Sequence, residues 1–262
     1  MSSDALQPKD LALAGAWLSG HGLAEARPTP LLAARLAVRR RARLANQVLL
    51  AALFIGAALI RVTFGFRPQH ALPLLLLAAM VAALLLAQVL LDQWVRRVDR
   101  RAGAALPRRT AHLAQPGWRT LLGTPHAAFM IATSGGAIVL AASALTVQDA
   151  TVRYAALVLL AGLLGVAAGI ALQLRDLLVR PIVAEDETSL TADVIMRVED
   201  ARELTVPSVP WTLPVLLLFG FAPVWWDAAA IALVIAGVLV LALISKRTPS
   251  SVAVARQVLS VR

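Results

Sequence analysis

The sequence predicts an all-α integral membrane protein with six transmembrane helices arranged as three hairpins. Two observations carry this prediction. First, 59% of the 262 residues are hydrophobic, whereas soluble domains hold about 45–50% apolar residues. Second, charged residues avoid the centres of the long apolar runs, and 22 of the 25 lysines and arginines fall in segments that six spans place on one side. Because such residues are retained in the cytoplasm, both termini are expected to lie inside.

Four apolar runs have the length of a single span. A hydrocarbon core about 30 Å thick needs roughly 20 residues of apolar helix, and residues 44–60, 72–91, 127–147 and 154–174 match this requirement. The last run, 211–244, is too long for one span and slightly short for two. We expect it to turn between Pro223 and Asp227 and to form two spans; the alternative is a re-entrant half-helix followed by one full span.

The predicted cell membrane is the bacterial inner membrane. Arginine outnumbers lysine by 23 to 2, and alanine and leucine are abundant, which is typical of a GC-rich bacterial genome. The predicted external segments hold three arginines, Arg61, Arg67 and Arg153. Residues 44–245 form the predicted membrane domain, with long cytoplasmic links at 92–126 and 175–210. Residues 246–262 form a cytoplasmic tail.

Residues 1–43 are predicted to be a cytoplasmic segment of two amphipathic helices, at 10–19 and 31–45. Thr29 and Pro30 form a favourable start for the second helix, with a capping side chain before a proline. This helix becomes basic towards its end, and we expect it to lie on anionic inner-leaflet lipids. The alternative is a solvated linker helix that merges into the first span. The predicted lipid contacts are Arg39, Arg40, Arg41 and Arg43.

The second cytoplasmic link contains an acidic stretch, within which residues 188–204 are predicted to be helical. Asp193 lies four residues before Arg197, a spacing that favours an ion pair. An anionic membrane surface repels such a helix, so it is expected to pack on protein, either on the basic link 92–126 or on a partner. The predicted partner contacts are Glu185, Asp186, Glu187, Asp193, Arg197, Glu199 and Asp200.

The residues that usually carry chemistry are missing from the predicted spans. Asp92, Asp176 and Asp227 all fall at span ends, which argues against coupling to ions within the bilayer. The sequence has no cysteine, and its four histidines have no metal-ligand spacing. Ser134 has no base at its depth, and no glycine-rich nucleotide loop is present. We therefore predict no enzyme activity, cofactor or metal, and no nucleic-acid partner.

Small residues recur at helical spacing in several spans and are predicted to be packing sites. Small side chains let helices approach closely in lipid, where packing drives association. The contact is expected within the bundle or, alternatively, with a second copy of the chain. The glycines predicted to serve this role are Gly56, Gly136, Gly165 and Gly169.

These features favour a transport permease subunit that works with a separate energy-coupling ATPase. The alternative is a membrane scaffold or regulatory subunit that binds a cytoplasmic partner. The layout resembles that of ATP-binding-cassette exporter permeases with a surface helix before six spans, a resemblance of architecture without a shared sequence motif. A permease is expected to contain a path between spans, lined by residues among Gln88, Thr133, Ser134, Ser143 and Gln173, whereas a scaffold is expected to be packed solid.

Overall fold

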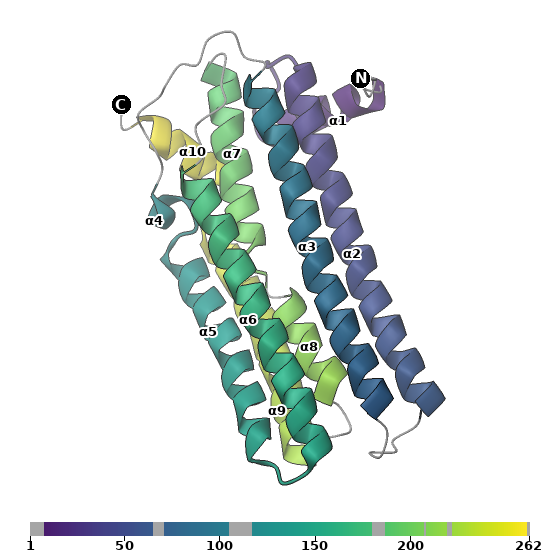
Figure 1. Cartoon of the computed structure of the whole chain (residues 1–262). Coiled ribbons are helices and arrows are strands. Elements are labelled where there is room, and N and C mark those ends of the chain that lie inside the picture. Colours follow the sequence, from purple (N-terminus) through teal and green to yellow (C-terminus); the bar gives the residue numbers. More distant parts are fainter. Residues whose placement is uncertain are drawn as a thin grey trace.

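A computed structural model describes residues 8–64, 71–104, 117–179, 187–206, 208–218 and 222–260. These residues form helices joined by turns, and no strand occurs among them. The elements in chain order are α1 (Pro8–Gly20), α2 (Pro30–Phe64), α3 (Ala71–Ala104), α4 (Trp118–Leu121), α5 (Thr124–Ser143), a 3-10 turn η1 (Ala144–Thr146), α6 (Ala150–Val179), α7 (Glu187–Glu203), α8 (Ser208–Leu218), α9 (Val224–Arg247) and α10 (Ser251–Ser260) (Figure 1).

Among the described residues, five helical segments are long and apolar enough to cross a membrane, and they lie in α2, α3, α5, α6 and α9. Large apolar side chains point outward from them: Val62 is 82% exposed, Ile131 68% and Leu239 60%. A soluble protein rarely exposes so much contiguous apolar surface, whereas a membrane-spanning bundle requires it. The all-helical membrane class predicted from the sequence is therefore confirmed.

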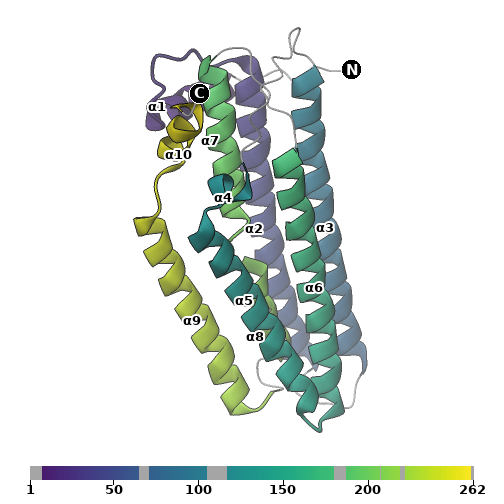
Figure 2. The ribbon, with the colours of Figure 1, turned by 90° about the vertical axis from the view of Figure 1, so that its left-hand side faces the viewer.

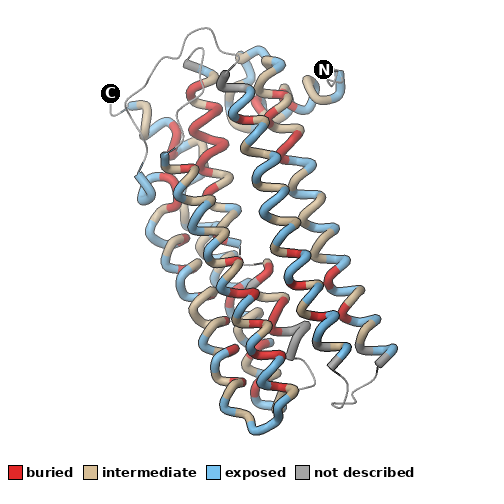
Figure 3. The backbone as a smooth tube through the Cα atoms, in the orientation of Figure 1, coloured by how far each residue is buried: buried red, intermediate tan, exposed pale blue. Residues whose placement is uncertain are grey.

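The long helices run side by side, and four short elements gather at one end (Figures 1 and 2). We call this region the polar end; it comprises α1, α4, α7 and α10 with the adjoining ends of α2 and α3. Helix α7 contacts α10, α4 and α6 there, and α1 contacts α2. Figure 3 shows that buried residues follow one another closely along α7. Helix α7 is thus a central element of the polar end rather than a surface helix.

The largest apolar core lies between the spans. It includes Leu53 of α2, Leu77 of α3, Leu159 of α6 and Leu213 of α8. Trp226 of α9 is fully buried in the same core, and its indole N–H donates a hydrogen bond to the Leu140 carbonyl at 2.8 Å. This bond satisfies the one polar group that the tryptophan carries into the core.

The N-terminal helix expected at 31–45 does not end before the first span. Helix α2 continues without interruption from Pro30 to Phe64, so the alternative in which this helix merges into the span is the observed one. Its start follows the prediction: the Leu32 amide donates to Thr29 Oγ1 at 3.3 Å. The other predicted helix, 10–19, corresponds to α1, Pro8–Gly20.

In the described part of the run 211–244, two full-length helices are not observed. Helix α8 has 11 residues, with Pro214 inside it, which corresponds to about 16 Å along the axis. That is about half of a hydrocarbon core. Only α9, with 24 residues, has the length of a span in this run. Six full-length spans are therefore not observed among the described residues.

Candidate functional site

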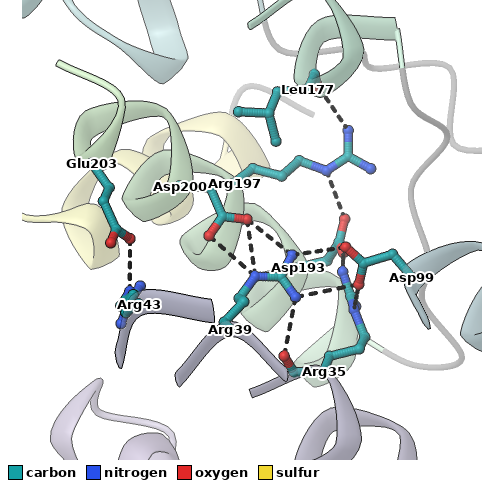
Figure 4. Close-up of polar contacts among 9 residues, drawn as sticks. All are labelled: Arg35, Arg39, Arg43, Asp99, Leu177, Asp193, Arg197, Asp200 and Glu203. Carbon is teal, nitrogen blue, oxygen red and sulfur yellow. Dashed lines mark hydrogen bonds and ion pairs between the residues drawn. The ribbon is translucent and has the colours of Figure 1, made fainter. Parts of the chain in front are cut away.

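The polar end encloses a cluster of ionised side chains, which we call the Arg–Asp cluster (Figure 4). Three helices contribute to it: α2, α3 and α7. Its six members are Arg35 and Arg39 of α2, Asp99 of α3, and Asp193, Arg197 and Asp200 of α7. Among the residues that the structure describes here, three arginines face three aspartates, so the formal charges of these six side chains cancel.

Asp99 is the shared acceptor between the two arginines of α2. Arg35 Nε donates to Asp99 Oδ1 at 2.9 Å. Arg39 donates to both oxygens of the same carboxylate, through Nη1 at 3.2 Å and Nη2 at 3.1 Å. The opposite side of the Arg39 guanidinium binds Asp200, with Nη2 to Oδ2 at 2.9 Å. Arg39 therefore ties α3 to α7 through two carboxylates.

Asp193 extends the cluster along α7. It accepts a hydrogen bond from Arg35 Nη2 and a second from Arg197 Nε at 2.8 Å. The Asp193–Arg197 pair predicted from the four-residue spacing is thus confirmed. Arg197 Nη1 also reaches the Leu177 carbonyl of α6 at 3.5 Å. Through these contacts the cluster joins four helices.

Most of the cluster is withdrawn from solvent. Asp193 is 0% exposed, Arg197 2% and Asp99 3%. Ions at such positions have lost their hydration, and mutual pairing offsets that cost only when the geometry is good. The bidentate contacts of Arg39 have that geometry. Removing one member would leave an uncompensated buried charge.

Helical periodicity explains how the sequence builds the cluster. Arg35, Arg39 and Arg43 are spaced by four residues, so all three lie on one face of α2. Asp193, Arg197 and Asp200, at spacings of four and three residues, likewise share one face of α7. Arg43 continues the contact at the edge of the cluster, where its Nε lies 2.7 Å from Glu203 Oε2 and both side chains are about half exposed.

A second polar contact joins α1, α7 and α10. His21, just after α1, lies with Nε2 at 2.7 Å from Glu199 Oε1 of α7. The His21 ring stacks on Trp17 at a centroid distance of 4.2 Å. Ser251 of α10 donates to the same Glu199 oxygen at 3.4 Å. Glu199 of α7 therefore contacts both the end of α1 and the start of α10.

The acidic helix packs on its own chain, but the cations that receive it are not those that we expected. Among the residues that the structure describes, they are arginines of α2, whereas the described part of the basic link 92–126 contributes an aspartate, Asp99, and the apolar residues Leu121 and Leu122. Among the predicted partner contacts, Asp193 and Arg197 are buried within the chain. The structure does not describe Glu185 or Asp186, nor the side chain of Glu187 at the start of α7.

The four arginines expected at the lipid surface have different surroundings. Arg39 is 7% exposed and belongs to the Arg–Asp cluster, so its charge is already matched. Arg43 pairs with Glu203 but remains about half exposed. Arg40 and Arg41 are exposed. Lipid contact stays a prediction for these three, and the burial of Arg39 argues against it there.

Three of the four glycines predicted to mediate packing lie against a neighbouring helix. A Cβ on Gly56 would meet Met80 at 2.7 Å, one on Gly165 would meet Leu85 at 2.9 Å, and one on Gly136 would meet Leu233 at 3.2 Å. Gly169 has no such neighbour within 4 Å. Gly162, which we did not predict, lies 2.9 Å from Val81 by the same measure.

Two of the three hydroxyls that we expected along a solute path bind the carbonyls of their own helix. Thr133 Oγ1 donates to Phe129 at 2.8 Å, and Ser143 Oγ donates to Leu140 at 2.7 Å. Gln88 of α3 donates to the Asn46 side-chain oxygen of α2 at 3.3 Å. The described residues include no group of three side chains suited to hold a metal ion.

Comparison of the chain with protein-family models, with curated proteins and with solved structures finds no match. The fold and the Arg–Asp cluster define the class of the molecule, which is a helical membrane protein with an ion-paired polar end.

Proposed function

We propose that the chain is a non-catalytic transport permease subunit that works with a separate energy-coupling protein. The observation that carries the proposal is α8, a half-length helix inside the bundle. It contacts α5, α6 and α9, and it contains Pro214. Interrupted helices at membrane depth are tolerated where they are buried in protein or line a water-filled cavity. Transporters commonly place their binding sites at such interruptions.

We further infer six crossings, as three hairpins, with both ends in the cytoplasm of a bacterial inner membrane. Helices α1 and α10 lie at the same end of the bundle, and α8 and α9 run in opposite directions along it (Figures 1 and 2). With an even number of crossings, α8 would belong to the fifth crossing and α9 would form the sixth. The distribution of lysine and arginine supports this orientation.

Reporter fusions test the crossings directly. Fusions after the predicted external sites should report outside: Arg67, Val152 and Val224. Fusions after the predicted internal sites should report inside: Gly103, Thr191 and Val254. An external signal after Val254 would overturn the model of six crossings. The segment that contains α8 would then be re-entrant, with both of its ends on the same side of the membrane.

The absence of cysteine from the sequence allows a sharp test of the solute path. Thr212 of α8 is partly buried, and Ile131 of α5 is 68% exposed on the lipid-facing surface. In membrane vesicles, a charged thiol reagent should modify Thr212→Cys if water reaches α8, whereas Ile131→Cys should stay unmodified in lipid. Arg256→Cys, on the exposed surface of α10, is the positive control. Equal protection of Thr212→Cys and Ile131→Cys would contradict a path beside α8.

The energy-coupling partner has a separate test. Purification from the native host in mild detergent should recover an ATPase with the chain. Recovery of a lone monomer, without an ATPase or a second copy, would overturn the permease proposal.

The second candidate function is a membrane scaffold or regulatory subunit. The hydroxyls of Thr133 and Ser143 favour it, because both donate to carbonyls of their own helix. In a solute path lined by these residues, the hydroxyls would be expected to point into the path. A protected Thr212→Cys together with a stable cytoplasmic partner other than an ATPase would be the result expected for a scaffold.

A further inference from the structure

Three buried side-chain atoms without a hydrogen-bond partner lie where the polar end meets the spans. They are His126 Nδ1 at the start of α5, Arg202 Nε near the end of α7, and Trp211 Nε1 in α8. His126 is only 4% exposed. Buried polar atoms are nearly always satisfied in folded proteins, so an unsatisfied group calls for an explanation.

The packing around these residues brings them to one region. Ala127 and Met130, which follow His126 on α5 by one and four residues, pack against the apolar cluster that includes Ala201, the residue before Arg202. The charge of Arg202 acts on His126. Trp211 meets Phe129, three residues beyond His126, in an edge-on contact at 6.3 Å. The three groups thus lie in order from the polar end into the bundle.

The chemistry of these atoms selects an anionic ligand. Arg202 Nε and Trp211 Nε1 can only donate hydrogen bonds, and His126 Nδ1 donates in one tautomer. Arg202 differs from Arg197, the other arginine of α7. Arg197 binds the Asp193 carboxylate, whereas Arg202 Nη1 donates to the neutral Pro249 carbonyl at 2.8 Å. Burial lowers the pKa of Arg202, and the charge of Glu199 opposes that effect. A bound anion would stabilise this guanidinium further.

We propose that Arg202 and His126 bind the phosphate of an anionic phospholipid, and that Trp211 donates to an ester carbonyl below it. His126 lies in the first turn of a span, at headgroup depth, and basic sites between spans suit such headgroups. Trp211 packs against Gly237 of α9. On the side of Gly237 that lies farther from the polar end, the exposed side chains Ile231 and Ile235 of α9 supply an apolar surface for an acyl chain. The site does not depend on a transport function, because a scaffold could hold the same lipid.

Binding to the purified full-length protein tests this site. The probes are dioctanoyl phosphatidylglycerol, dioctanoyl phosphatidylcholine and inorganic phosphate, followed by native mass spectrometry and by thermal shift. Phosphatidylglycerol should bind more tightly than phosphatidylcholine. Arg202→Gln should weaken its binding by about tenfold or more, the effect of losing one charge-assisted hydrogen bond. The matched control is Arg175→Gln, which removes an exposed cation of α6 and should change binding by less than about twofold.

Further variants separate the roles of Arg202 and Trp211, and they show whether a loss of binding results from misfolding. Arg202→Lys keeps the charge and should retain part of the affinity for phosphatidylglycerol. Trp211→Phe should weaken the binding of the phospholipid but not the binding of inorganic phosphate. Binding of inorganic phosphate alone, lost in Arg202→Gln, would keep the anion site and overturn the lipid as its occupant. Equal binding of phosphatidylglycerol and phosphatidylcholine, or equal affinities for Arg202→Gln, Arg202→Lys and Arg175→Gln, would overturn the proposal.

Discussion

Asp99 offers the most direct test of the Arg–Asp cluster. The substitution Asp99→Asn keeps the size of the side chain but removes the carboxylate that Arg35 and Arg39 share. The cluster then holds three arginines and two aspartates, so one buried positive charge is uncompensated. Removing one partner from a buried ion pair costs about 3–5 kcal/mol. We expect a loss of that size in the free energy of unfolding, measured by tryptophan fluorescence during denaturation in detergent micelles.

Two further variants make this prediction specific. Adding Arg35→Met to Asp99→Asn restores neutrality, because Arg39 keeps Asp200 and Arg197 keeps Asp193. At least half of the lost stability should return. The control is Glu203→Gln, in the half-exposed Arg43–Glu203 pair, which should cost less than about 1 kcal/mol. The reasoning is refuted if Asp99→Asn costs no more than Glu203→Gln, or if the double variant is as unstable as the single one.

Two other substitutions test the packing of the spans by the same unfolding measurement. Gly162→Ala should destabilise the protein by about 1–3 kcal/mol, because its Cβ would lie 2.9 Å from Val81 and 3.2 Å from Leu213. Gly169→Ala, with no neighbour within 4 Å, should be neutral or stabilise by up to about 1 kcal/mol; the reverse order would contradict the observed contacts. Trp226→Phe removes the donor to the Leu140 carbonyl and should cost about 1–3 kcal/mol, whereas Trp225→Phe, at a residue that is 56% exposed, should cost less than about 0.5 kcal/mol. Equal losses would show that the indole hydrogen bond does not contribute.

Local patterns in the sequence are sufficient to predict several helices and contacts. The acidic helix predicted at 188–204 is observed at Glu187–Glu203, and the signal that predicted it is the recurrence of apolar residues every three to four positions in the sequence. The Thr29 cap and the Asp193–Arg197 pair also depend on residues close together in the chain. Local spacing determines such contacts, so a single sequence contains the information needed to predict them.

The contacts that organise the polar end could not be predicted in the same way. Arg39 and Asp200 are 161 residues apart, and many other arginines could have paired with that aspartate. The basic stretch of α2 was interpreted as lipid-facing because hydropathy does not distinguish a cation that meets a headgroup from one that meets a carboxylate. Similarly, the apolar run 211–244 gave no indication that the short helix α8 would begin before it, at Ser208, and be described only as far as Leu218, since Pro214 is compatible with both interpretations.

The continuity of α2 has a mechanical consequence. From Arg35 in the Arg–Asp cluster to Phe64 at the far end, the helix is one rod of about 44 Å, and no proline follows Pro30 within it. A change of about 5° in the tilt of this rod, pivoting at Arg35, would displace its distal end by about 4 Å. Rearrangement of a few ion pairs on one side of the membrane would therefore displace the distal end of α2 on the other side. The conformation of the spans themselves would not need to change.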